Sequence, residues 1–208
     1  MTGANRVGPD GAFATLPRRG AFMGNRGCLH DATGTIRRTH QTRRWITCTL
    51  REKPGRGPVP QGAPGRYTPL FFLDEAVAAA AGHRPCAECR RAAYDAFRAA
   101  WARAFGATES ADAIDGVLHA ARIDPATRGQ RRHAARAEDL PSGAFLLWQG
   151  RPHLVTDGAM RPYAPDGYAA RLPLPGGQVT VLTPEPMVRV MRAGWHPALS
   201  AAEDHPRW

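Results

Sequence analysis

The chain has 208 residues, and its hydrophobic content of 43% excludes a globally disordered protein because it is sufficient for a buried core. No apolar run approaches the roughly 20 residues of a membrane span, so we expect no membrane segment and no membrane partner. The formal net charge of +10, carried almost entirely by arginine, favours an anionic partner, and nucleic acid is the class that we expect.

The N-terminal half contains signals for three short strands. Residues 21–31 predict a short strand around Cys28, and residues 35–50 predict its hairpin partner across a turn at Gly34, with β-branched and aromatic residues concentrated at 45–50. Residues 67–73 are apolar and aromatic and predict another short strand. The Pro- and Gly-rich residues 51–66 form a long connection, which indicates a functional or mobile loop.

Helices are predicted in the middle of the chain. Asp74 is a good N-cap for a short helix over 75–81 that stops at Gly82. A longer helix is expected after residue 89, because aromatic residues recur at spacings of three and four as far as Phe105. Thr108 or Ser110 can cap a further helix that runs to Arg122. The polar and basic residues 123–139 indicate a linker or a loop that faces phosphates.

The pattern becomes β-rich from Leu140. Residues 144–148 and 153–156 flank a turn at Gln149-Gly150, which predicts a hairpin. Further strands are expected near 160–163 and over 178–182, and Thr183 is expected to cap a helix that ends near Ala193. These signals predict an α+β protein whose C-terminal half is a small barrel-like sheet with one helix.

The most informative motif is Cys86-Ala87-Glu88-Cys89, because two thiols separated by two residues can bind one metal ion. The first 20 residues contain no apolar signal segment, so we expect a cytoplasmic protein whose four cysteines are thiols or metal ligands. Cys89 is expected in the first turn of the following helix, where the helix dipole favours a thiolate.

The remaining ligands must come from elsewhere in the chain. Cys48, on a predicted strand, is the first candidate and Cys28 is the second, which together give the four-cysteine set of a structural zinc site. His30 is the alternative fourth ligand; weaker rivals are His40, His83 and Glu52. The competing interpretation is that Cys28 and Cys48 are simply small buried residues.

Two stretches carry a family resemblance. The letters FFLDEA at 71–76 and AGHRPCAECR at 81–90 resemble the N-terminal metal-binding domain of the bacterial Ada adaptive-response protein, which has an aromatic strand, a short helix and an RPC-x-x-C motif. The resemblance covers roughly residues 40–105, about a third of the chain. No methyltransferase half with a Pro-Cys-His-Arg motif follows it.

The resemblance implies a zinc ion held by four cysteines, one of which accepts a methyl group from a DNA phosphotriester. By its position after an aromatic-aliphatic strand, Cys48 corresponds to that acceptor. The family has a C-x-x-x-C pair at this place, whereas this chain reads Cys48-Thr-Leu-Arg-Glu52. Cys28 or a histidine then replaces the missing cysteine, or the metal has three protein ligands and an open position.

Two sets of residues are candidates for contact with nucleic acid or its chemistry. The cations nearest Cys48 are expected to contact phosphates: Arg43, Arg44, Arg51, Lys53 and Arg56. On the predicted helix before residue 122, Asp115 and His119 share a face, and Arg122 follows at a spacing of three. This arrangement can serve acid–base chemistry on a phosphate ester, but the spacing favours the simpler interpretation, an ordinary ion pair on a helix surface.

The sequence thus predicts a zinc-binding domain at 1–106, a helix and basic linker at 107–139, and a β-rich domain at 140–208. The expected function is zinc-dependent binding of nucleic acid, DNA in particular, in the repair or sensing of alkylation damage, with Cys48 as a zinc-bound thiolate. The alternatives are a nucleic-acid hydrolase that uses Asp115, His119 and Arg122, and a non-catalytic interaction module stabilised by zinc.

Overall fold

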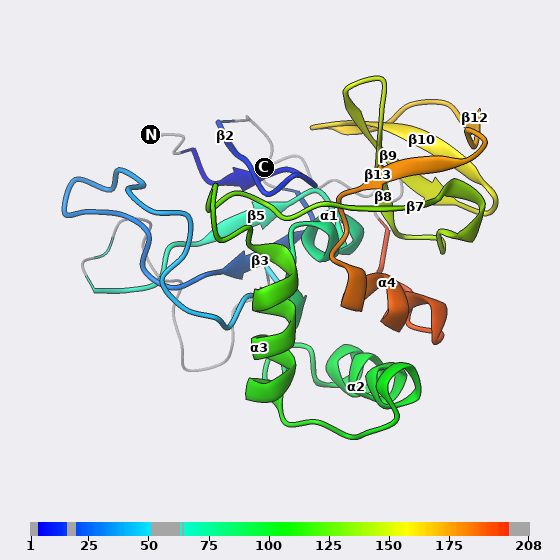
Figure 1. Ribbon diagram of the computed structural model, residues 1–208. Helices are drawn as coiled ribbons and strands as arrows, with labels where there is room; N and C mark the ends of the chain where they lie inside the picture. The colour runs from blue at the N-terminus through cyan, green and yellow to red at the C-terminus, as the bar shows by residue number, and fades with distance from the viewer. Residues whose placement is uncertain (1–3, 16–19, 51–62, 64, 200–208) are drawn as a thin grey trace.

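The computed structural model describes residues 4–15, 20–50, 63 and 65–199. Within these residues the fold is α+β, as predicted, with two β-sheets and four α-helices. Figure 1 shows the two sheets on either side of helix α1, with α2, α3 and α4 together below them. No helix in the described part of the chain is long and apolar enough to cross a membrane.

The first sheet has the strand order β2-β1-β5-β3-β4-β6. Its strands are β1 (Arg6–Val7), β2 (Phe13–Ala14), β3 (Phe22–Asn25), β4 (Ile46–Cys48), β5 (Leu70–Phe72) and β6 (Arg84–Pro85). Strand β4 pairs antiparallel with β3, which confirms the predicted hairpin partner, and parallel with β6. Strand β3 ends at Asn25, so the prediction of a strand around Cys28 was wrong: Cys28 lies in the loop that follows.

The three helices predicted in the middle of the chain are present. They are α1 (Glu75–Ala80), α2 (Arg91–Phe105) and α3 (Ala111–Arg122). The Asp74 side chain accepts a hydrogen bond from the Val77 amide at 2.9 Å, and Ser110 caps α3 in the same way. Helix α2 begins only at Arg91, so the prediction that Cys89 lies in its first turn was wrong. Cys89 belongs to the turn that precedes the helix.

The second sheet has the order β11-β10-β9-β8-β13-β7, and β12 pairs with β10. Its strands are β7 (His133–Arg136), β8 (Phe145–Trp148), β9 (Arg151–Thr156), β10 (Ala159–Ala164), β11 (Gly167–Tyr168), β12 (Leu172–Pro173) and β13 (Gln178–Val181). The predicted β8–β9 hairpin is confirmed, and both turn residues, Gln149 and Gly150, have positive φ. The described strands form an open sheet, not a closed barrel.

Two local predictions in this half were wrong. Residues 123–139 are not only a linker, because β7 lies within them and pairs with β13, and a 3-10 helix (η1, Ala137–Asp139) follows it. Helix α4 (Glu185–Arg192) is preceded by Pro184 as its N-cap residue. Thr183 instead accepts a hydrogen bond from the Phe145 amide at 2.8 Å, which ties the start of α4 to β8.

The hydrophobic core extends across the predicted domain limits. One cluster joins Trp101 of α2 and Ile114 of α3 to Leu146 of β8 and Val181 of β13. Another joins the apolar residues of β5 and α1 to Phe145 and to other residues of the second sheet. Helix α1 is buried along its whole length between them, which explains why four of its six residues are alanine.

Candidate metal centre

Three cysteine thiols meet at one end of the first sheet. The Sγ atoms of Cys48, Cys86 and Cys89 lie within 4.8 Å of one another. Cys48 is the last residue of β4, and Cys86 follows β6 directly. The parallel pairing of β4 with β6 aligns Thr47 with Pro85, and the Cys86 amide donates to the Thr47 carbonyl at 3.0 Å. The backbone of the sheet therefore positions two of the three thiols.

The third thiol is positioned by a tight turn. The Arg90 amide donates to the Cys86 carbonyl at 3.0 Å, and the Cys89 amide points at the Cys86 Sγ at 3.5 Å. An amide directed at sulfur stabilises the thiolate, which is the form that binds metal. The Arg90 side chain forms an ion pair with the buried Glu75, so the turn is held against α1.

The pKa values of Cys48 and Cys86 shift in opposite directions. A hydrogen bond from Cys48 and the backbone amides of the turn lower the pKa of Cys86 to about 5. The same hydrogen bond to Cys86, together with burial, raises the pKa of Cys48. These directions favour the thiolate on Cys86 over the thiolate on Cys48. Three close thiols of this kind can bind a metal ion, which would displace the remaining protons.

Tyr67 is a neighbour of this cluster that the sequence did not suggest. Burial raises its pKa, and charge on Cys48 and Cys89 raises it further. Its only signal in the sequence is its place at the start of an aromatic segment, which is equally typical of a core residue.

The structure does not bring the predicted fourth ligands to the cluster. The group of described metal-ligating side chains contains three cysteines and omits both Cys28 and His30. The Cys28 thiol faces the His30 carbonyl at 3.7 Å. Both ring nitrogens of His30 are engaged, Nδ1 with the Thr68 hydroxyl at 2.6 Å and Nε2 with the Ala63 carbonyl at 3.2 Å. Glu52 lies outside the described residues.

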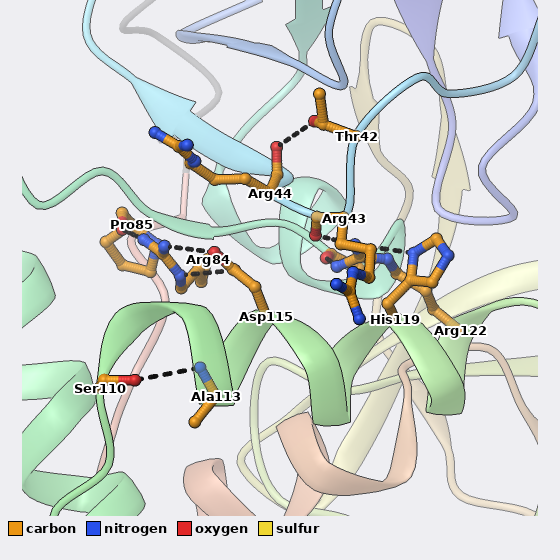
Figure 2. Close-up of polar contacts among 11 residues, drawn as sticks. Thr42, Arg43, Arg44, Arg84, Pro85, Ser110, Ala113, Asp115, His119 and Arg122 are labelled. Atoms are coloured by element: carbon orange, nitrogen blue, oxygen red, sulfur yellow. Dashed lines mark hydrogen bonds and ion pairs between the residues drawn. The ribbon is translucent and has the colours of Figure 1, made fainter.

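Asp115 and His119 do not form the predicted acid–base pair. Both carboxylate oxygens of Asp115 accept from Arg84, at 2.8 Å from Nε and 2.7 Å from Nη2, and the two side chains are 2% and 3% exposed. Figure 2 shows this pair and His119 at separate places along α3. Burial raises the pKa of Asp115, while the Arg84 guanidinium opposes the rise. Asp115 therefore anchors β6 to α3.

His119 and Arg122 belong to a different cluster. Arg122 is 1% exposed and donates to the carbonyls of Gly82 at 2.8 Å and Arg43 at 2.5 Å, and its Nη2 lies 3.3 Å from the His119 Nδ1. Trp45 lies beneath the Arg122 guanidinium, and His40 and His83 pack against the Trp45 ring. His40 and His83, which the sequence offered as weaker candidates for metal ligands, therefore pack against Trp45.

Two of the predicted phosphate contacts can be placed. Arg43 and Arg44 are exposed in the segment that leads into β4. In Figure 2 the Arg43 side chain lies beside His119, whereas the Arg44 side chain points away from it. The other predicted contacts lie outside the described residues: Arg51, Lys53 and Arg56.

The comparisons with known proteins give no match. No family model matches the chain, and neither a curated protein nor a solved structure is similar to it. The site therefore has to be interpreted from its own chemistry.

Proposed function

We propose that the protein binds a zinc ion through Cys48, Cys86 and Cys89 and uses this end of the first sheet to bind nucleic acid. The observation that carries the proposal is the convergence of three thiols from two paired strands and one turn. Thiolate is a soft ligand that favours zinc over magnesium or calcium, and three protein ligands leave one coordination position for water or a substrate.

Exposed cations on the segments that lead into β4 and β5 support an anionic partner. Arg43 and Arg44 are exposed on the segment before β4, and Arg66 is exposed on the segment before β5. The chain as a whole carries a formal charge of +10. Cations that neutralise backbone phosphates make binding strongly dependent on salt. The resemblance of residues 40–105 to the Ada-type domain supports DNA as the polymer.

The same resemblance supports a role for Cys48 in alkylation damage. In this proposal the Cys48 thiolate attacks the methyl carbon of a phosphotriester; an S–C bond forms, the C–O bond breaks, and a phosphodiester anion leaves. A zinc ion bound by Cys48, Cys86 and Cys89 would keep this thiolate deprotonated while leaving it nucleophilic. Cys48 is only 6% exposed, so this reaction requires the triester to gain access to a largely buried sulfur.

Metal content and an internal control test the zinc proposal. Protein purified without added metal should contain one equivalent of zinc, and Cys86→Ser should lose it. Cys28→Ser is the matched control, because Cys28 is a free cysteine outside the cluster and its substitution should leave the zinc content unchanged. A zinc content below about half an equivalent in the parent, with no change in Cys86→Ser, would contradict the proposal.

Nucleic-acid binding has its own test. A duplex oligonucleotide should bind with an affinity that falls as salt rises, and the double change Arg43→Gln and Arg44→Gln should reduce the slope of log K against log salt by about 2. Arg91→Gln, on the exposed start of α2, removes a positive charge elsewhere and serves as the control. Equal slopes in both variants would exclude these contacts.

Methyl transfer is tested by mass spectrometry. After exposure to DNA that carries methyl phosphotriesters, Cys48 should gain the mass of one CH2 group, whereas Cys28 should not. An unmodified Cys48, under conditions that alkylate a control methyl acceptor, would leave the protein as a zinc-dependent binding module.

A further inference from the structure

Two buried guanidinium groups lie over one tryptophan ring. The Cζ atoms of Arg26 and Arg122 are 4.0 and 3.9 Å from the centre of the Trp45 ring. Arg26 is 2% exposed, Arg122 is 1% exposed and Trp45 is 3% exposed. A cation over an indole face is favourable, but it supplies no opposite charge.

Neither arginine bonds to a carboxylate among the described residues. Arg26 Nε donates to the His83 Nε2 at 3.3 Å, and its Nη1 reaches two carbonyls at 3.5 Å. Arg122 bonds only to carbonyls and to His119, because Asp115 is already occupied by Arg84. The Arg26 Nη2 and the Arg122 Nε are buried without a partner in the described structure.

The positive charge of this arrangement is opposed only in part, by the charge of Asp115 acting on Arg122. Burial lowers the pKa of Arg26 to about 9, and burial together with the charge of Arg26 lowers the pKa of Arg122. A buried cation that forms no ion pair with a carboxylate destabilises the fold. An anion that approaches the cluster would offset this cost.

Two imidazoles form the accessible border of the cluster. The rings of His40 and His119 are 5.1 Å apart, both are partly exposed, and both pack near Trp45. An arginine can only donate, so the His119 Nδ1 accepts from Arg122 and the proton of the neutral ring lies on Nε2. Burial and the charge of Arg122 lower the pKa of His119 to about 4, so this ring is neutral at pH 7 and keeps its Nε2–H as a donor.

We propose that the cluster of Arg26, Arg122, Trp45, His40 and His119 is a binding site for a phosphate group, separate from the cysteines. The phosphate lies on the solvent side of the two imidazoles, receives the His119 Nε2–H and is attracted by both guanidinium groups. Arg43, which lies beside His119 in Figure 2, closes the site from the surface.

A phosphate fits this cluster better than a carboxylate. A phosphate has more charge than a carboxylate and presents oxygens in several directions. This suits donors that come from different elements, which are the loop after β3, the segment before β4 and helix α3. The proposal deepens the proposed nucleic-acid binding and rests on it only for the source of the phosphate, which is either a polymer backbone or a free phosphate compound.

The test follows the imidazole signals of the intact, metal-loaded protein by NMR. Inorganic phosphate and an oligothymidylate are titrated separately at constant ionic strength, with chloride as the balancing anion. The His40 and His119 resonances should shift and saturate, whereas those of His133, on β7, should not. Saturation by inorganic phosphate alone would identify a free phosphate compound as the ligand; tighter saturation by the oligonucleotide would identify a backbone.

Variants distinguish a specific binding site from a general effect of charge. His119→Gln and Arg122→Lys should each weaken phosphate binding about tenfold or more, because the first alters the donor to the phosphate and the second removes the guanidinium that donates to the His119 Nδ1. His133→Gln is the control and should bind as the parent does. If Arg122→Lys does not fold, as judged by circular dichroism, His40→Gln at the accessible border provides the second measurement.

Two results would overturn the site. One is that neither probe shifts His40 and His119 in the parent; the other is equal affinity in the parent, His119→Gln and His40→Gln. Oligonucleotide binding that these variants leave unchanged would reject this phosphate site while retaining nucleic-acid binding elsewhere. Phosphate binding without oligonucleotide binding would retain the site and reject the proposed nucleic-acid function.

Discussion

The sharpest structural prediction concerns Asp115. Asp115→Ala removes the carboxylate that pairs with Arg84 and leaves a guanidinium that is 2% exposed. Loss of one partner of a buried pair costs about 3–5 kcal/mol. Arg84 keeps a hydrogen bond to the Pro85 carbonyl at 3.0 Å and a stacking contact with Tyr94, so we expect the lower end, about 3 kcal/mol. This is a large fraction of a stability of roughly 5–15 kcal/mol.

Urea unfolding measures this loss directly. With a slope of about 1–3 kcal/mol per molar urea, a loss of 3 kcal/mol lowers the midpoint by roughly 1–3 M. Asp95→Ala is the control, because the Arg91–Asp95 pair is exposed and spans 3.8 Å, and such pairs contribute less than about 1 kcal/mol. Equal losses in the two variants would refute the assignment of Asp115 as a buried anchor.

Three further predictions concern Gly82, His119 and the bound metal. In urea unfolding, Gly82→Ala should destabilise the protein by about 1–3 kcal/mol more than Gly106→Ala. Both glycines have positive φ, but only at Gly82 would an added Cβ lie 2.5 Å from the Arg122 side chain. Equal losses of stability in the two variants would contradict this prediction. Stability should fall from pH 6.5 to pH 4, because histidine in the unfolded chain binds a proton in this range whereas folded His119, with its lowered pKa, does not. His119→Gln should reduce this loss of stability by about 1–2 kcal/mol. An unchanged dependence of stability on pH would contradict the prediction. A chelator should lower the unfolding temperature of the parent but not of Cys86→Ser, and equal shifts would exclude metal linkage.

The local sequence predicted most of the elements because their signals are local. Asp74 and Ser110 have short polar side chains that cap helices, and Gln149-Gly150 supports a tight turn; each acts within a few residues. Strand β7 has no such signal, since HAAR is short, basic and rich in alanine. Its pairing with β13 decides its conformation, and that partner lies more than 40 residues away.

The site was predictable only in part, for the same reason. The C-x-x-C spacing identified Cys86 and Cys89, and the strand character of 45–50 identified Cys48. The contacts made by residues from distant segments could not be deduced. Arg84 pairs with Asp115, and both Arg26 and Arg122 pack on the Trp45 ring. Spacing on one helix predicts which side chains share a face, but not which residues from distant segments contact that face.

The most direct test of the central claim is X-ray absorption at the zinc edge on protein purified without added metal. We expect three sulfur ligands at about 2.3 Å and one nitrogen or oxygen ligand at about 2.0–2.2 Å. The same three-sulfur shell should remain in Cys28→Ser. Four sulfur ligands in the parent that fall to three in Cys28→Ser, or a shell without sulfur, would contradict a metal centre built from Cys48, Cys86 and Cys89.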